Sequence, residues 1–245
     1  MPGTGGAGGG EDTSLISASR VVTRRLHAAS WLLAASCSRF RCSATRLASS
    51  SAAAFCALAD ELSCWLLIGS ISIKLDGDKL SNRSFLVGPD GAIVARYSKI
   101  HMFDVQVGDG ATYRESHTYE PGTEAVLAAT PWGPLGMTIC YDIRFPALYR
   151  TLAQAGAGMI TAPAAFTQVT GQAHWHVLQR ARAIENGAFI ISAAQTGTHA
   201  EGRQTYGHSV IVAPWGEVLA DAGEAPGVIT AEIDLADVAK ARGKV

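Results

Sequence analysis

Short apolar runs bounded by polar turns predict an alternation of strands and helices from about residue 54 onward. Runs rich in aliphatic and β-branched residues are typical of buried strands, and longer segments of mixed polarity are typical of helices. By this pattern we expect strands at residues 65–73, 135–139, 158–162 and 188–193. Helices are expected at residues 55–62, 147–155 and 173–186, and Gly187 fits a helix C-cap.

Two hairpins of the same shape lie far apart in the sequence. Residues 84–95 place a Pro-Asp-Gly turn between two apolar runs, and residues 209–220 place a Pro-Trp-Gly turn in the same way. This near-repeat predicts two similar halves built from strands, hairpins and helices. Helices that alternate with buried strands indicate a layered α/β fold.

The composition narrows the classes of partner. With 245 residues, 48% of them hydrophobic and 17% charged, the chain can bury a large core. Its net charge of −1 gives no reason to expect nucleic acid, and no apolar run approaches the roughly 20 residues that span a bilayer. We therefore expect a small-molecule substrate, no nucleic acid and no membrane. The five cysteines show neither metal-type pairs nor a disulfide framework, so a reducing, cytoplasmic location is the simpler expectation.

Residues 1–53 differ from the remaining 54–245. The first ten residues are mostly glycine, which is typical of disorder, and residues 13–59 hold six arginines but no acidic residue. That composition is typical of an organelle transit peptide, which leaves an organelle as the alternative location. Glu11 and Asp12 precede it, whereas the start of a transit peptide is normally poor in acidic residues. We favour a second explanation, a locally shifted reading frame, because the regular pattern resumes abruptly near residue 54.

Cys140 is the best candidate for chemistry, because it ends the apolar run at 135–139 and opens a polar corner. Arg144 lies four residues later, and nearby positive charge favours the reactive thiolate. An inert core cysteine is the competing interpretation. Lys99 and Glu115 would each, taken alone, be solvated surface charges. Convergence of the three would supply a nucleophile, an electrostatic stabiliser and a proton carrier.

Two segments make the chain recognisable: residues 97–104 read YSKIHMFD, and residues 139–146 read ICYDIRFP. With the spacing of Lys99, Glu115 and Cys140, these segments resemble the nitrilase superfamily of carbon–nitrogen hydrolases. Further matches within the resemblance, which covers residues 55–242, lie at residues 163–166, 174–175, 180–186 and 206–209.

The resemblance implies a four-layer α-β-β-α sandwich that pairs through its β-rich faces as a homodimer, without metal or organic cofactor. Cys140 would attack an amide carbonyl and form a thioester. Lys99 and the backbone N–H of Tyr141 would hold the oxyanion, and Glu115 would be a supporting carboxylate.

The resemblance also implies a base glutamate near residues 30–40, but no carboxylate occurs there. Loss of one acid–base group is expected to lower the rate on the order of 10²–10⁴-fold. The family usually continues past Val245 with a short basic tail. We therefore expect domain 54–245 to lack its normal N-terminal part and the chain to be an impaired enzyme.

Within the superfamily, the motifs look most like the deaminated glutathione amidase branch, whose substrate is a carboxamide that also bears a carboxylate. By motif position Arg144, Phe166 and Thr170 would line the substrate site, and a guanidinium can bind a carboxylate in bidentate fashion. Core packing is the competing interpretation for Phe166. The alternative activity is that of an ω-amidase acting on 2-oxoglutaramate-like acids.

Two other classes of function remain open on the sequence. One is a catalytically silent homologue that only binds. The other is a cysteine peptidase that pairs Cys140 with His174 or His208, although no peptidase signature surrounds the cysteine. Arg182 and Glu185, three residues apart on a predicted helix, are expected to form a structural ion pair.

Overall fold

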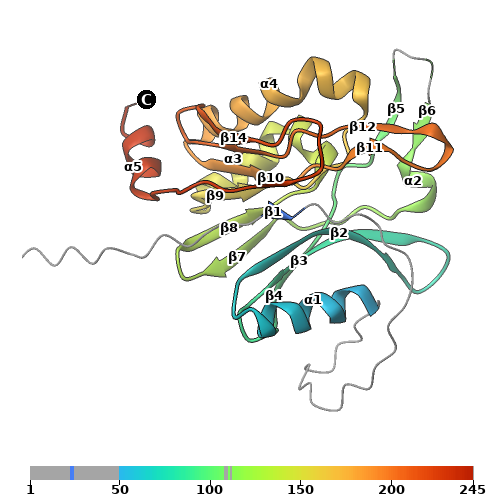
Figure 1. The fold of residues 1–245 in the computed structure, drawn as a ribbon, viewed down its shortest axis with the longest axis horizontal. Helices are drawn as coiled ribbons and strands as arrows, with labels where there is room; N and C mark the ends of the chain where they lie inside the picture. Colours follow the sequence, from blue (N-terminus) through green and yellow to red (C-terminus); the bar gives the residue numbers. More distant parts are fainter. Residues whose placement is uncertain (1–22, 25–49, 108–109, 111, 245) are drawn as a thin grey trace, which may run out of the picture.

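The computed structural model describes residues 23–24, 50–107, 110 and 112–244, and these residues form four stacked layers. In Figure 1 a helical layer lies above a large sheet, and a smaller sheet lies below it with one helix on its outer face. The predicted α-β-β-α sandwich is confirmed. Three hydrophobic clusters fill the three spaces between the layers.

The smaller sheet consists of β2 (Leu66–Lys74), β3 (Leu80–Val87) and β4 (Ile93–Ser98), paired antiparallel in that order. Helix α1 (Ser50–Glu61) covers its outer face. Alternation along β3 explains both contacts: Phe85 and Val87 join the cluster under α1, whereas Leu86 joins the cluster between the sheets.

The larger sheet has the order β14-β13-β10-β9-β8-β7. Strands β8, β9 and β10 are parallel to one another, and the other neighbours are antiparallel. Along β10, Phe189 and Ile191 face the smaller sheet while Ile190 faces the helices, so both faces are buried. The bounds are β7 (Val126–Thr130), β8 (Gly133–Met137), β9 (Met159–Thr161), β10 (Phe189–Ser192), β13 (Val210–Val212) and β14 (Val218–Asp221).

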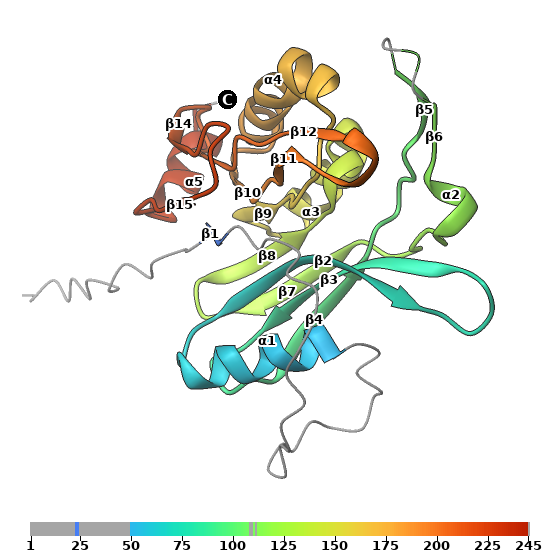
Figure 2. The same cartoon turned by 45° about the vertical axis from the view of Figure 1, so that its right-hand side comes forward.

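Helices α3 (Pro146–Gln154) and α4 (Gln168–Asn186) form the upper layer, which Figure 2 shows from a second side. Trp175 and Tyr149 are fully buried between these helices and the larger sheet. Helix α4 begins before the predicted residue 173, because Thr167 acts as its N-cap and accepts a hydrogen bond from the Thr170 amide. Gly187 ends it with φ +53°, as predicted.

The two predicted hairpins are confirmed, and each sheet holds one of them. The turn at residues 88–92 joins β3 to β4, and the turn at residues 213–217 joins β13 to β14 at the edge of the larger sheet. The predicted strands and helices all occur, with ends shifted by a few residues; for instance, β8 ends at Met137, before the expected residue 139.

Several short elements carry no clear pattern in the sequence and were not predicted. The hairpin of β5 and β6 rises beside α4, with α2 at its base (Figure 2). These elements are β5 (Asp104–Gln106), β6 (Thr112–Arg114), α2 (Glu115–Thr118), η1 (Cys140–Arg144), β11 (Thr196–Thr198), η2 (Ala200–Gly202), β12 (Gln204–Tyr206), β15 (Val228–Ile229) and α5 (Ala236–Arg242).

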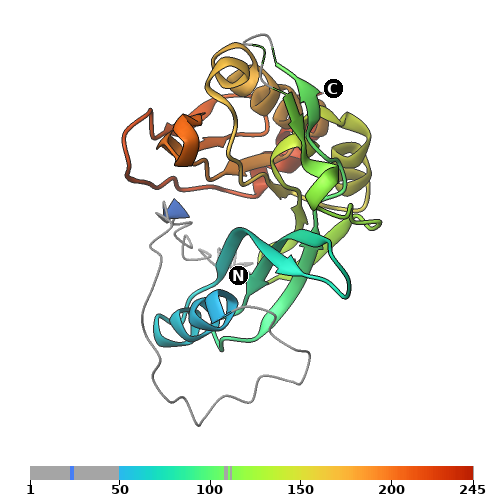
Figure 3. The same cartoon turned by 90° about the vertical axis from the view of Figure 1, so that its right-hand side faces the viewer.

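The predictions for the first 53 residues fall largely outside the described part of the chain. Strand β1 (Thr23–Arg24) pairs antiparallel with β15, and α1 begins at Ser50, before the domain boundary that we expect at residues 53/54. Figure 3 shows α1 and the smaller sheet from the side. Among the helices described, none combines the length and the apolar character needed to cross a membrane.

Candidate active site

Cys140 sits at a sharp turn where the chain leaves the larger sheet. Its backbone is left-handed, with φ +50°, a conformation that few non-glycine residues adopt. The Cys140 amide donates to the carbonyl of Pro163 at 2.9 Å, and the short 3₁₀ helix η1 begins at the same residue. The strained turn leaves Cys140 half-buried, and the next residue, Tyr141, lines a cavity.

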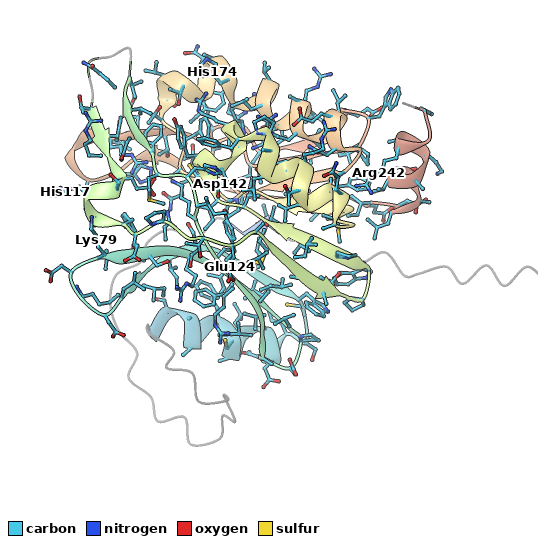
Figure 4. All side chains as sticks on the ribbon, turned by 180° about the vertical axis from the view of Figure 1, so that it is seen from behind. Lys79, His117, Glu124, Asp142, His174 and Arg242 are labelled. Atoms are coloured by element: carbon cyan, nitrogen blue, oxygen red, sulfur yellow. The ribbon has the colours of Figure 1, made fainter. Side chains whose placement is uncertain are left out.

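A buried carboxylate, Asp142, holds this turn. It accepts hydrogen bonds from the Ile139 amide at 2.9 Å and from the Tyr97 hydroxyl at 2.7 Å. It also accepts from the His101 amide at 3.0 Å and lies 2.7 Å from Nδ1 of the same residue. Figure 4 shows Asp142 in the middle of the molecule, below the helical layer. Asp142 therefore joins the cysteine turn to residues 97–101, which form the end of β4 in the other sheet and the residues after it.

Lys99 and Glu115 form a buried ion pair, with 2.5 Å between Nζ and Oε2. Lys99 is 3% exposed, and Glu115 is 14% exposed. The Phe103 amide donates to the same carboxylate at 2.6 Å, and the Asn82 side chain donates to it at 3.3 Å. Each carboxylate oxygen thus has a donor, which offsets the cost of burying the charge.

Asp142 links the segment that carries Lys99 to the turn that carries Cys140 and Tyr141. Lys99 lies between Tyr97 and His101, and both of these flanking residues bond to the carboxylate two positions after Cys140. The segments contact each other a second time, because the Phe103 and Tyr141 rings have centroids 5.0 Å apart. The segment that carries Lys99 and the cysteine turn therefore lie side by side, and they come from different sheets.

A cavity of about 380 Å³ opens beside this site, between β5, η1 and α4. Arg144 and Thr170, both predicted to bind substrate, line it. Phe166 is instead buried, with its ring 4.9 Å from Trp175, and it contacts Arg144, whose guanidinium lies 5.4 Å from the ring centroid. The lining residues are Phe103, Val105, Gln106, Val107, Tyr141, Arg144, Val169, Thr170, Ala173 and His174.

Arg144 makes this cavity cationic. Its Nη2 lies 3.2 Å from Nδ1 of His174, and the guanidinium also lies 5.9 Å from the Tyr141 ring. Among the described residues that line the cavity, none carries a carboxylate. Figure 4 places His174 on the helical layer above. The cavity therefore suits an anionic group on an otherwise mixed polar and apolar molecule.

Sequence reasoning missed the residues that position the site. Asp142, Tyr97 and His101 stand inside the two recognisable segments, but their partners are more than 40 positions away. Burial and the charge of Asp142 raise the pKa of the Tyr97 phenol well above its usual value, so the hydroxyl remains a donor. The signal that could have pointed to this network is the presence of further ionisable side chains beside Lys99 and beside Cys140.

The histidines of the peptidase alternative have other partners. His174 contacts Arg144, and His208 lies 2.9 Å from Asp221. The Arg182–Glu185 ion pair is confirmed at 2.8 Å, and Arg182 Nε also donates to the Ile143 carbonyl in η1. Neither histidine contact orients an imidazole as a base for Cys140.

The sequence model of the carbon-nitrogen hydrolase family matches residues 30–243. The chain belongs to the carbon-nitrogen hydrolase family. It is 48% identical over 181 residues to the deaminated glutathione amidase of Synechocystis sp., a match that covers 72% of this chain and 66% of that protein. It is 40% identical over 188 residues to omega-amidase NIT2 of Bos taurus, covering 77% of this chain and 68% of that protein.

The fold comparison agrees with the family. The crystal structure of the C. elegans NitFhit protein superposes with a TM-score of 0.75 at 40% sequence identity, covering 80% of this chain and 48% of that chain. The chain spans just under two thirds of the length of the Synechocystis relative. Residues 30–40, where we expect the base glutamate, fall outside the described residues.

Proposed function

We propose that this chain cleaves the carbon–nitrogen bond of a linear carboxamide through a thioester on Cys140, releasing ammonia. The observation that carries the proposal is the Asp142 network, which holds the strained cysteine turn beside the segment that carries Lys99, the partner of Glu115. Relatives in the same family bear the name deaminated glutathione amidase at 48% identity, which supports this activity.

In the first step the Cys140 thiolate attacks the amide carbon, and the carbonyl oxygen becomes an oxyanion. The Lys99 ammonium and the Tyr141 amide, which belongs to the first turn of η1 and has no intrahelical acceptor, would stabilise that charge. The carbon–nitrogen bond then breaks, the nitrogen takes up the proton that the Cys140 thiol gave up and leaves as ammonia, and the thioester remains. Glu115 orients Lys99 and can carry the proton.

In the second step water attacks the thioester, and a general base removes its proton. Residues 13–59 contain no carboxylate to serve as that base. We expect thioester hydrolysis to be slowed on the order of 10²–10⁴-fold relative to a member with its base glutamate. The acyl-enzyme should therefore accumulate.

The substrate proposed is a carboxamide that also carries a carboxylate, as in deaminated glutathione. Arg144 supports this class, because it is the cation among the residues that line the cavity. An ω-amidase activity on 2-oxoglutaramate is the second candidate, supported by the 40% identity to omega-amidase NIT2.

The experiment is ammonia release from deaminated glutathione and from 2-oxoglutaramate, with the parent chain and with Cys140→Ala. We expect release by the parent and none by the variant, and the faster substrate decides between the two activities. Mass spectrometry of the quenched reaction should show the acyl group on the parent alone. A folded parent that neither releases ammonia nor becomes acylated would instead support a silent, binding homologue.

Arg144→Gln tests carboxylate recognition. We expect a rise in KM of about 10- to 100-fold, corresponding to the roughly 1.5–3 kcal/mol of a hydrogen bond to a charged group, with a smaller change in kcat. Arg150→Gln, a change at an exposed position of α3, is the matched control and should leave both constants unchanged. An unaltered KM in Arg144→Gln would contradict the assignment.

We also propose a cytoplasmic homodimer. Val177 and Ile184, two helical turns apart on α4, are 67% and 49% exposed, and Trp215 in the adjoining hairpin turn is 48% exposed. This apolar face lies on the helical layer, so it favours pairing there, in place of the β-rich faces that we expected from the resemblance. Sedimentation of the full chain gives the oligomeric state, and imaging of the tagged chain gives its location.

A further inference from the structure

Three metal-ligating side chains converge on the edge of the larger sheet, outside the candidate active site. They are His176 from α4, His208 before β13, and Asp221 at the end of β14. His176 Nε2 lies 2.7 Å from Asp221 Oδ2, and His208 Nδ1 lies 2.9 Å from Asp221 Oδ1. The ligand atoms of the three residues all lie within 4.8 Å of one another.

The backbone fixes two of these side chains independently of their contacts with each other. His208 has φ +54°, in the left-handed region, and its amide donates to the Gly223 carbonyl at 2.8 Å. Its own carbonyl accepts from the Trp175 indole at 2.8 Å. The Gly223 amide donates to Asp221 Oδ1 at 2.7 Å, which sets the carboxylate plane. The ligand set is therefore preorganised.

The cluster is accessible on one side and covered by an aromatic ring on the other. The Tyr206 ring stacks on His208 with centroids 4.4 Å apart and meets His176 edge-on at 6.0 Å. His176 is 33% exposed, His208 20% and Asp221 29%. Water can therefore reach the ligand atoms, as a coordination position open to solvent requires.

This cluster is separate from the catalytic cavity. His174 lines that cavity, whereas His176 follows it by two positions, which turns a helix by roughly 200° and places the two imidazoles on opposite sides of α4. Trp175, fully buried, lies between them in the sequence. A ligand at the cluster would not occupy the substrate site.

We propose that His176, His208 and Asp221 bind one zinc ion, which links α4 to the β13–β14 hairpin. Two imidazole nitrogens and one carboxylate oxygen, with water in a fourth position, form a common tetrahedral donor set for this metal. Ligand atoms on one zinc ion stand roughly 3.3 Å apart, so the two contacts of Asp221 would open by about 0.5 Å, and the two imidazole nitrogens lie within 4.8 Å of each other. Each neutral imidazole would move its proton to the ring nitrogen that does not bind the metal.

The test is equilibrium dialysis of the full chain against zinc after removal of metal with a chelator. We expect one zinc ion per chain. Asp221→Asn and His176→Gln should each weaken binding by more than about 100-fold, beyond the 10–100-fold that follows loss of a supporting residue. Asp221→Asn keeps an acceptor for the Gly223 amide, which preserves the turn. His117→Gln, at an exposed histidine on α2, is the matched control and should bind as the parent does.

Substitution of zinc by cobalt distinguishes metal binding at this cluster from metal binding by the cysteines. Cobalt(II) held by nitrogen and oxygen gives visible bands without the near-ultraviolet charge-transfer band of a thiolate. Zinc should also raise the Tm of the parent but not of Asp221→Asn, whose circular dichroism verifies that it is folded. Thiolate charge transfer at one equivalent, equal affinity in parent and Asp221→Asn, or no saturable binding would each overturn the proposal and leave a hydrogen-bonded cluster.

Discussion

Tyr97 is a residue whose chemistry is strongly altered by its surroundings. It is fully buried, and its hydroxyl donates to the Asp142 carboxylate at 2.7 Å. Burial, and then the neighbouring negative charge, raise the pKa of the phenol far above its ordinary 10.0. The native state therefore keeps this proton at a pH where the unfolded chain loses it.

Because protonation of Tyr97 is linked to folding, the raised pKa predicts how the free energy of unfolding changes at alkaline pH. Since the native pKa of Tyr97 is raised, its contribution to stability is complete below pH 10 and is lost as pH rises above that value. The loss amounts to about 1.4 kcal/mol per pH unit for one group. Tyr97→Phe removes this pH-dependent loss, so the free energy of unfolding of the variant should fall less steeply above pH 10 than that of the parent.

Urea unfolding at a series of pH values measures this difference. At neutral pH the same variant should be less stable by about 1.5–3 kcal/mol, because Asp142 loses a donor. Parallel alkaline slopes in parent and variant would contradict the role given to Tyr97.

At the scale of elements, the packing of α4 against β12 depends on a glycine, Gly171. A Cβ atom on Gly171 would lie 2.3 Å from Cβ of Tyr206, closer than two non-bonded carbon atoms can approach. The helix and the strand meet at this point, and Tyr206 in turn stacks on His208. Glycine, although unfavourable in a helix, is required here by the close approach.

Gly171→Ala should therefore destabilise the protein in spite of the better helix propensity of alanine. Overpacking of this kind costs about 1–3 kcal/mol, against a gain of up to about 1 kcal/mol from propensity. Gly227→Ala is the control, because nothing lies within 4 Å of its added Cβ. Thermal unfolding should rank Gly171→Ala below the parent and Gly227→Ala beside it, and the reverse order would refute the packing argument.

Elements with a clear hydrophobic pattern could be predicted from the sequence, whereas elements held by partners far away in the sequence could not. The continuous apolar run Phe85-Leu86-Val87, followed by a turn, marks β3 correctly, because both faces of that strand are buried. The hairpin of β5 and β6 lacks such a pattern, and Ser116 next to it is held by the Asp104 carboxylate. Likewise Cys140 could be singled out from its sequence motif, whereas the role of Asp142 depends on partners that only the tertiary structure brings near.

At the scale of the whole molecule, Arg242 connects the end of the described chain to two distant segments. Its Nε donates to the Asn186 carbonyl at 3.1 Å, and its Nη2 donates to the Ala157 carbonyl at 2.7 Å. Figure 4 shows Arg242 at the side of the larger sheet. Val238 on the same helix is buried in the cluster between the sheets, so α5 is part of the core.

Arg242→Ala should lower the free energy of unfolding by about 1.5–3 kcal/mol, since two carbonyl groups lose a charged donor. Arg242→Lys should recover only part of the loss, because an ammonium cannot reach both acceptors with the planar geometry of a guanidinium. Lys240→Ala, whose side chain is 64% exposed, is the control and should leave stability close to that of the parent. Denaturant unfolding measures all three, and equal stability of Arg242→Ala and Lys240→Ala would contradict the prediction.

The Asp142 network spans two sheets, and this ties the reactivity of the cysteine to the last stage of folding. The cysteine turn follows β8, whereas Lys99 follows β4, so neither sheet alone carries the ammonium, the carboxylate and the thiol. A growing or partly unfolded chain would keep its helices and strands while its thiol stayed without its charged partners. On the role proposed for Cys140, activity should therefore disappear before secondary structure does when the sheets separate.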